Sequence, residues 1–130
     1  MADYTPVYSG GAVPRTHTTS AAVTGGRLLI VSGDGTVAHA TAQAATVVGV
    51  AAHDAGSGAK VAVWPIDGVI HEVEAAGAIT AAGGVAAAAN GQVEAVTTSI
   101  AAGSAAGSLV GVASTTAAGS PLKVRFVGRH

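Results

Sequence analysis

The sequence predicts an all-β fold, a small barrel or sandwich built from two similar strand-rich halves and preceded by an extended N-terminal arm. Two observations predict this class. Short runs rich in valine and other β-branched residues are separated by glycine turns at close spacing, which is typical of barrels and sandwiches. A set of four short sequence motifs, which we call landmarks, also occurs twice in the same order. Such a repeat indicates one structural unit written twice.

The repeat is centred on the motif Val-Gly-Val-Ala. In each copy a glycine pair and a glycine turn precede this motif, and a lysine-led apolar run follows it. The landmarks lie at 25–26, 35–37, 48–51 and 60–63 in the first copy, and at 83–84, 91–93, 110–113 and 123–126 in the second. We therefore expect two internal halves, at about 25–74 and 79–128.

Composition limits the classes of protein that this chain represents. Its 130 residues predict one domain. Seven acidic and six basic side chains leave a net charge of -1, which argues against nucleic-acid binding because that requires a clustered basic face. The chain has no cysteine, which excludes disulfides and thiolate metal sites. The charge-free stretch 95–122 is broken by four glycines, so we expect no membrane-spanning helix.

The apolar residues are small. The chain has 31 alanines and 19 valines, but only four leucines, five isoleucines and one each of Met, Phe and Trp. Burial stabilises by roughly 25 cal/mol per Å², and alanine offers little surface, so we expect a thin core. Such a chain gains stability by oligomerising or by docking on a partner. The alternative is a stable monomer from a GC-rich genome that favours Ala, Gly and Val codons.

Residues 1–18 are expected to form the arm, and 19–130 the single β domain. Both tyrosines lie in the arm without helical or strand periodicity, and its prolines favour extended backbone. Tyrosine is a favoured interface anchor, so we expect the arm to contact a neighbouring subunit; a frayed terminus is the alternative. The residues expected to make this contact are Tyr4, Pro6, Val7, Tyr8, Pro14 and Arg15.

The first half is expected to open with a hairpin and to continue with three strands. A β-branched run, a Ser-Gly-Asp-Gly turn and a return run predict the hairpin. The expected elements are a hairpin at 27–39, a strand at 47–52, a loop at 53–58 and strands at 60–64 and 69–74. Alternation in the last strand places His71 and Val73 on one face and Glu72 and Glu74 on the other.

The second half is expected to repeat this order. Asn90-Gly91 is the strongest two-residue hairpin signal and predicts a weak hairpin over 85–89 and 92–96. Glycines flank the alanine run and oppose a helix there, each costing a helix about 1 kcal/mol. The remaining elements expected are a flexible loop at 99–108, a strand at 109–114 and a strand at 122–126, with Leu122, Val124 and Phe126 facing inward.

The residues that carry chemistry form no catalytic or metal-binding set. The histidines share no metal-ligand spacing, and neither an H-E-x-x-H motif nor a G-x-S-x-G elbow occurs. The aspartates lie in predicted turns, where their side chains bond nearby backbone N–H groups. We therefore expect no enzyme, no cofactor and no metal. Trp64, beside Pro65, is expected in the core or at an interface.

Taken in order, the motifs of the whole chain carry a resemblance to a known family. They are residues 1–4 with the proline-containing arm, then 20–28, 34–37, 48–51, 60–63, 78–83, 90–93, 110–113 and 123–126. This order resembles the capsid decoration (head cement) proteins of tailed bacteriophages. Each motif carries little information alone, but their order is specific, and the resemblance covers nearly the whole chain.

The resemblance implies a fold related to the β-tulip of head decoration proteins and a non-enzymatic structural role in the virion. It implies a homotrimer on the outer capsid surface, seated between capsomers of the major capsid protein. The protein would be made in the host cytoplasm and would have no nucleic-acid or membrane partner. We expect the chain to cement the mature head lattice, with its arm laid across the capsid protein or an adjacent subunit. The alternative is an exposed β-domain that binds a glycan or a host surface through Trp64 and the loops 53–58 and 99–108.

Overall fold

The computed structural model describes residues 3–96 and 108–129, and strands dominate this part of the chain. The strands are β1 (Arg15–Thr19), β2 (Leu28–Gly33), β3 (Thr36–His39), β4 (Val47–Ala51), β5 (Lys60–Trp64), β6 (Ile70–Glu74), β7 (Gly84–Ala87), β8 (Val93–Ala95), β9 (Leu109–Ala113) and β10 (Lys123–Gly128), with one 3-10 turn at Ala89–Gly91. The predicted all-β class is confirmed.

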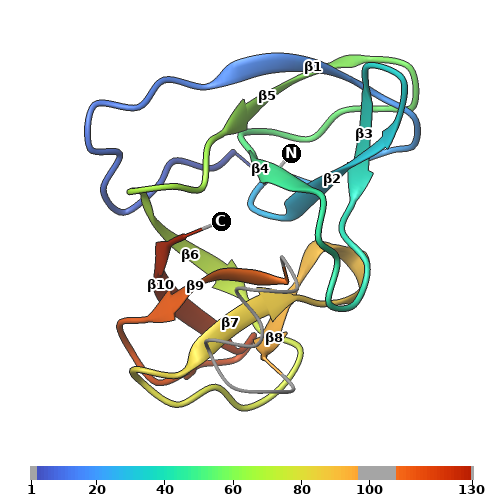
Figure 1. Cartoon of the computed structure of the whole chain (residues 1–130). Coiled ribbons are helices and arrows are strands. Elements are labelled where there is room, and N and C mark those ends of the chain that lie inside the picture. The colour runs from blue at the N-terminus through green and yellow to red at the C-terminus, as the bar shows by residue number, and fades with distance from the viewer. Residues whose placement is uncertain (1–2, 97–107, 130) are drawn as a thin grey trace.

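The strands form two bodies that pack on one another (Figure 1). The first is a closed barrel in the order β1-β3-β2-β4-β5, and the second is a five-stranded sheet in the order β6-β10-β9-β7-β8. Strands β1 to β5 make the barrel and β6 to β10 make the sheet. Strand β6 lies within the expected first half at 25–74, but it belongs to the second body.

The two halves repeat the same strand pairing. Leu29 of β2 lies opposite Gly49 of β4, and Val85 of β7 lies opposite Gly111 of β9. The register shifts immediately after Leu29 in the first pair and immediately after Val85 in the second. Identical pairing with a bulge at the same place shows that the repeated Val-Gly-Val-Ala motifs are structural equivalents.

The repeat begins earlier in the chain than its sequence landmarks. Strand β1 pairs with β5, with Arg15 opposite Val63. Strand β6 pairs with β10 in the same way, with His71 opposite Phe126. Strand β1 is therefore the counterpart of β6, and residues 15–18 of the predicted arm lie in the barrel.

Closure distinguishes the two halves. Parallel pairing of β1 with β3, which sets Thr19 opposite Val37, closes the barrel. In the second half the equivalent place holds an isolated parallel bridge between Ala75 and Val93. The sheet therefore approaches the same closed form.

Small side chains dominate the core, as the composition predicts. The barrel encloses one cluster, formed by Val23, Leu29, Val37, Ala51, Val61 and Val63. A larger cluster holds the second half's counterparts of all six, namely Ile79, Val85, Val93, Ala113, Val124 and Phe126. Leu28, Val47 and Val50 of the barrel belong to this larger cluster. The outer face of β2 and β4 is thus buried against the second half.

The hairpin turn and the strand alternation predicted in the second half are largely confirmed. Asn90 and Gly91 both have positive φ, at 59° and 72°, as a type I′ hairpin turn requires. On β10, Val124 and Phe126 are buried and the residues between them are exposed, while Leu122 precedes the strand. Residues 99–107 of the predicted loop lie outside the described residues. Within 3–96 and 108–129, no helix has the length and apolar character needed to span a membrane.

Candidate interaction surface

The N-terminal segment before β1 passes the junction of the two halves and then turns toward β1 (Figure 1). The backbone N–H of Val7 donates to the carbonyl of Ile70 at 2.9 Å, and the N–H of Ile70 donates to the carbonyl of Tyr8 at 2.9 Å. These bonds add a short bridge to the free edge of β6. The arm is thereby attached to its own chain through the sheet that it extends.

Tyr4 is the inner anchor of this segment. Its hydroxyl lies 2.7 Å from Nδ1 of His71 and accepts the backbone N–H of Glu72 at 3.2 Å. The Tyr4 and His71 rings are stacked with their centroids 5.8 Å apart, and the His71 and Phe126 centroids are 5.9 Å apart. The predicted contact residue Tyr4 therefore packs on its own chain.

Burial shifts the pKa values of this pair. It lowers the pKa of His71 to about 4, against a smaller opposite effect of the hydrogen bond to the Pro65 carbonyl. Burial likewise raises the pKa of the Tyr4 hydroxyl far above its ordinary value. At neutral pH the imidazole is therefore uncharged and the phenol keeps its proton.

The other predicted arm residues are more open to solvent. Val7 and Tyr8 are 46% and 60% exposed. Pro14 and Arg15 are exposed as well, whereas Pro6 is half-buried. The outward part of the arm is thus formed by Val7 and Tyr8 near β6 and by the residues that lead into β1.

An outward row of apolar side chains crosses the second sheet and ends on the arm. Val112 of β9 lies opposite Val127 of β10, which lies opposite Ile70 of β6, which bridges to Tyr8. Directly paired residues point to the same face of a sheet. Val127 is 37% exposed, and Ile70 and Val112 are half-buried. We call these four residues the apolar row.

Paired charges flank the apolar row on the same face. Glu72 lies opposite Arg125, with a carboxylate oxygen 3.8 Å from Nε, and Glu74 lies opposite Lys123. Glu74 is also bound by Arg27 of the first half at 2.7 Å. The surface therefore has an apolar strip with a mixed-charge border, which is the usual composition of a protein–protein contact.

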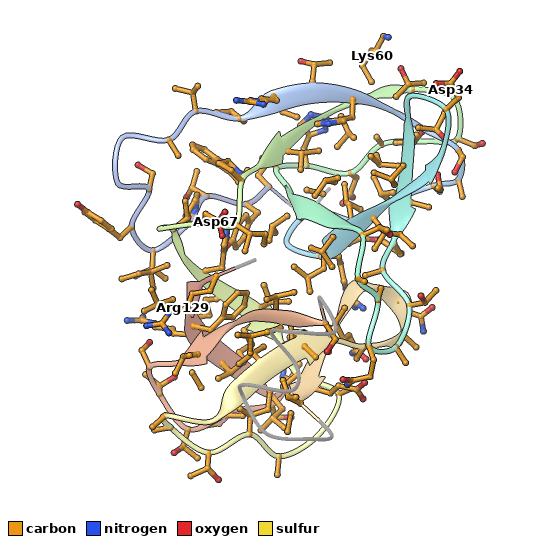
Figure 2. The ribbon with its side chains drawn as sticks, in the orientation of Figure 1. Asp34, Lys60, Asp67 and Arg129 are labelled. Carbon is orange, nitrogen blue, oxygen red and sulfur yellow. The ribbon has the colours of Figure 1, made fainter. Side chains whose placement is uncertain are left out.

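Charges elsewhere on the molecule are also mixed in sign (Figure 2). Asp34 and Lys60 lie at the end of the barrel farthest from the second sheet, and Asp67 and Arg129 lie nearer the junction of the halves. Each place holds one acidic and one basic side chain. The apolar row is therefore a better candidate surface than any charged patch among these residues.

Trp64 lies in β5 and is half-buried. Its indole Nε1 is enclosed and makes no hydrogen bond within the described part of the chain. A cavity of about 310 Å³ opens beside this strand end, lined by Arg15, His17, Val48, Val63 and Pro65. The arm residue Arg15 and the strand end at Trp64 are thus neighbours across the β1–β5 pair.

Three members of the apolar row, Ile70, Val112 and Val127, escaped the sequence analysis. A signal for Val127 was present, because continuing the alternation of 122–126 by one residue places a valine on the outward face. The row itself depends on which strands pair, which local pattern does not encode. Among residues 3–96 and 108–129, no group of three or more His, Cys, Asp or Glu is placed to hold a metal ion.

Comparison with solved structures finds a protein of similar fold. No family model matches the sequence, and no curated protein matches it. The N base of head fiber gp8.5 in bacteriophage phi29 superposes on the chain with a TM-score of 0.64 and 20% sequence identity, over 90% of this chain and 93% of that one. At this identity the likeness concerns the fold alone. The chain therefore has, over nearly its whole length, the fold of a phage head fiber base.

Proposed function

We propose that this chain is a structural protein of a bacteriophage head that binds the outer capsid surface and stabilises the mature lattice. The observation that carries the proposal is the shared fold with a head fiber base, which spans 90% of this chain and 93% of the other. A fold alone does not fix a function. The surface of this chain supplies the second argument.

The apolar row is the proposed contact with the capsid. Tyr8 and Val127 leave apolar surface in water, and removing such surface from water drives association. The flanking ion pairs form a polar border that favours one orientation. A contact of this kind does not depend on net charge, which suits a chain whose net charge is -1.

Assembly into a trimer is part of the proposal. A core made mainly of valine and alanine provides limited stability to a small domain, so burial of further surface between copies is favourable. Three linked copies also bind a repeating lattice by avidity, because the second and third attachments are intramolecular. The proposed partners are the major capsid protein and other copies of this chain.

Co-sedimentation with capsids that lack this protein tests the proposal. Expanded and unexpanded shells are compared, and the mass of the free protein is measured by light scattering. Saturable binding to expanded shells and a trimeric mass are expected. If neither shell carried the protein to the pellet, the capsid proposal would be wrong, and surfaces such as the Trp64 end of the barrel would be tested against glycans.

Two substitutions test whether the apolar row makes the contact. Tyr8→Ala and Val127→Ser each remove exposed apolar surface, and each is expected to weaken capsid binding by roughly tenfold or more if it lies at the centre of the contact. Val31→Ser is the matched control, because Val31 is 51% exposed but lies on β2 of the barrel. Equal losses in all three variants would contradict this placement.

A further inference from the structure

The imidazole of His71 is fully buried and bonded through both nitrogens. Nε2 lies 2.8 Å from the carbonyl oxygen of Pro65, which can only accept a hydrogen bond, so Nε2 carries the proton. Nδ1 is then the acceptor and receives the hydroxyl proton of Tyr4 at 2.7 Å. This arrangement requires a neutral imidazole.

The segment 3–8 depends heavily on this bond. Its other polar attachments in the described part of the chain are the bond from the Glu72 N–H to the Tyr4 hydroxyl at 3.2 Å and backbone bonds, from the Tyr4 N–H to the Ala52 carbonyl at 2.8 Å and between the arm and Ile70. Tyr4 adds ring contact with His71 and covers the Nδ1 side of its imidazole. Loss of the Tyr4–His71 bond would leave the segment held by the Glu72 bond and a few backbone bonds.

We propose that His71 is a pH-sensitive latch, which holds the segment 3–8 on its own chain while neutral and releases it when Nδ1 is protonated. A proton on Nδ1 takes away the acceptor of the Tyr4 O–H. The hydroxyl must then turn its proton away and accept from Nδ1–H as well as from the Glu72 N–H, so its own proton loses the partner it had. The new charge would also lie between the aromatic rings of Tyr4 and Phe126, away from water. Both effects favour the released segment. The latch does not depend on the proposed capsid function.

The charged groups nearby do not offset this cost. Glu72 and Glu74 neighbour His71 on β6 but alternate to the opposite face. Lys123 and Arg125 lie on that same outward face of β10. The charged groups on the elements packed around the latch are Asp3 on the arm, Asp67 beyond Pro65, Arg27 of the first half, Glu72 and Glu74 on β6, and Lys123 and Arg125 on β10.

The direction of the pH effect depends on whether His71 binds a proton more tightly when the segment 3–8 is docked or when it is released. In the docked segment the pKa of His71 is lowered to about 4, from an ordinary value of 6.5. Release exposes Nδ1 to water and returns the pKa toward its ordinary value. Docking is therefore strongest above about pH 6.5 and weakens by up to about tenfold per pH unit down to about pH 4. Below that pH the effect levels off.

NMR on the full-length, ¹⁵N-labelled protein tests the latch. The heteronuclear NOEs of the amides in residues 3–8 report their order, and the imidazole resonances of His71 report its protonation. We expect these amides to lose order together as His71 titrates, while the amides of β1 to β10 keep their folded shifts. Amides 3–8 that stay equally ordered at pH 4 and pH 7.5 would overturn the proposal.

Variants separate the effect of His71 from that of the nearby carboxylates. In His71→Phe the order of residues 3–8 is expected to be independent of pH between 7 and 4, whereas His17→Phe, at a partly exposed site, is expected to respond like the parent chain. The same response in His71→Phe as in the parent would assign it to Asp3, Glu72 or Glu74 and overturn the latch.

Tyr4→Phe provides a second test that does not alter the core. It keeps the ring and removes the hydroxyl that stabilises neutral His71. We expect the pKa of His71 to rise and residues 3–8 to lose order at a higher pH than in the parent chain. An unchanged pKa and an unchanged midpoint would contradict the role assigned to the Tyr4 hydroxyl.

Discussion

At the scale of single residues, the two central glycines of the repeat are required by close backbone contact. A Cβ at Gly49 would lie 2.0 Å from the carbonyl oxygen of Trp64, and one at Gly111 would lie 2.4 Å from that of Val127. In both halves the neighbouring strand passes over the glycine at the same place. The repeated glycine thus keeps β4 against β5 and β9 against β10.

We expect Gly49→Ala and Gly111→Ala each to reduce the free energy of unfolding by about 3 kcal/mol, since the strands must separate to admit the methyl group. Urea unfolding followed by circular dichroism measures the change. Gly77→Ala is the control, because no atom lies within 4 Å of a Cβ built there. A loss in Gly77→Ala as large as that in Gly49→Ala would remove the steric explanation.

Ala82 has a left-handed backbone conformation that favours glycine. It has φ of 72°, and Gly26, at the equivalent place in the first half, has φ of 83°. The N–H of Gly26 donates to the Ala51 carbonyl, as the N–H of Ala82 does to that of Ala113. The second half therefore keeps the turn but places alanine where glycine is less strained.

Ala82→Gly is expected to raise the free energy of unfolding by about 0.5–1 kcal/mol, because relief of the left-handed strain exceeds the added entropy of the unfolded chain. Thermal and urea unfolding measure this gain. The neighbouring Ala81→Gly is the control, since Ala81 has no positive φ, and it should destabilise slightly. Destabilisation by Ala82→Gly would contradict the strain argument.

At the scale of elements, Arg27 connects the two halves. It precedes β2, and its guanidinium donates to the Glu74 carboxylate of β6 at 2.7 Å and to the Asn90 carbonyl of the β7–β8 turn at 3.0 Å. Both partners belong to the second half. The side chains of Arg27 and Glu74 are 26% and 28% exposed, so solvent screens the pair only in part.

Arg27→Ala is expected to lower the free energy of unfolding by about 1 kcal/mol, since it removes an ion pair and a hydrogen bond to a carbonyl. Arg125→Ala is the matched control. Arg125 pairs with Glu72 at 3.8 Å, and its side chain is 49% exposed. Arg125→Ala should therefore leave the free energy of unfolding almost unchanged. If both variants lost equal stability, the loss in Arg27→Ala could not be attributed to the link between the halves.

Elements were predictable where the local pattern is strong and were missed where it is weak. The two hairpins, β4, β5, β9 and β10 follow from valine runs and glycine turns. All of β1 except Thr19 falls within the predicted arm, because Arg15–Thr19 has no apolar residue, although its three threonines are β-branched and favour strands. No two equivalent positions of β1 and β6 carry the same residue, so only the pairing with β5 and β10 reveals the match.

The candidate surface was less predictable than the fold, for a related reason. Tyr4 and Tyr8 look alike in sequence, but Tyr4 is enclosed against His71 while Tyr8 is 60% exposed. Which tyrosine points inward depends on a histidine far along the chain. Long-range pairing of this kind also assembles the apolar row, so its members could not be found from spacing alone.

At the scale of the whole molecule, the halves share a core and should not be independent. The larger hydrophobic cluster takes Leu28, Val47 and Val50 from the barrel and Val85 and Phe126 from the second half. The barrel's own cluster has only six buried residues, with Val and Ala predominant. Neither half therefore keeps its apolar surface buried when the other is unfolded.

We expect the chain to unfold in one cooperative transition, as small domains with a shared core do. Trp64, in β5, reports the barrel by fluorescence, and far-UV circular dichroism reports all the strands. The two urea curves should have the same midpoint and slope. A Val85→Ala substitution in β7 should cost about 1–2 kcal/mol and shift the Trp64 curve as far as the dichroism curve. A Trp64 transition that stayed in place while the dichroism curve moved would show that the barrel folds by itself, and would make the halves two domains.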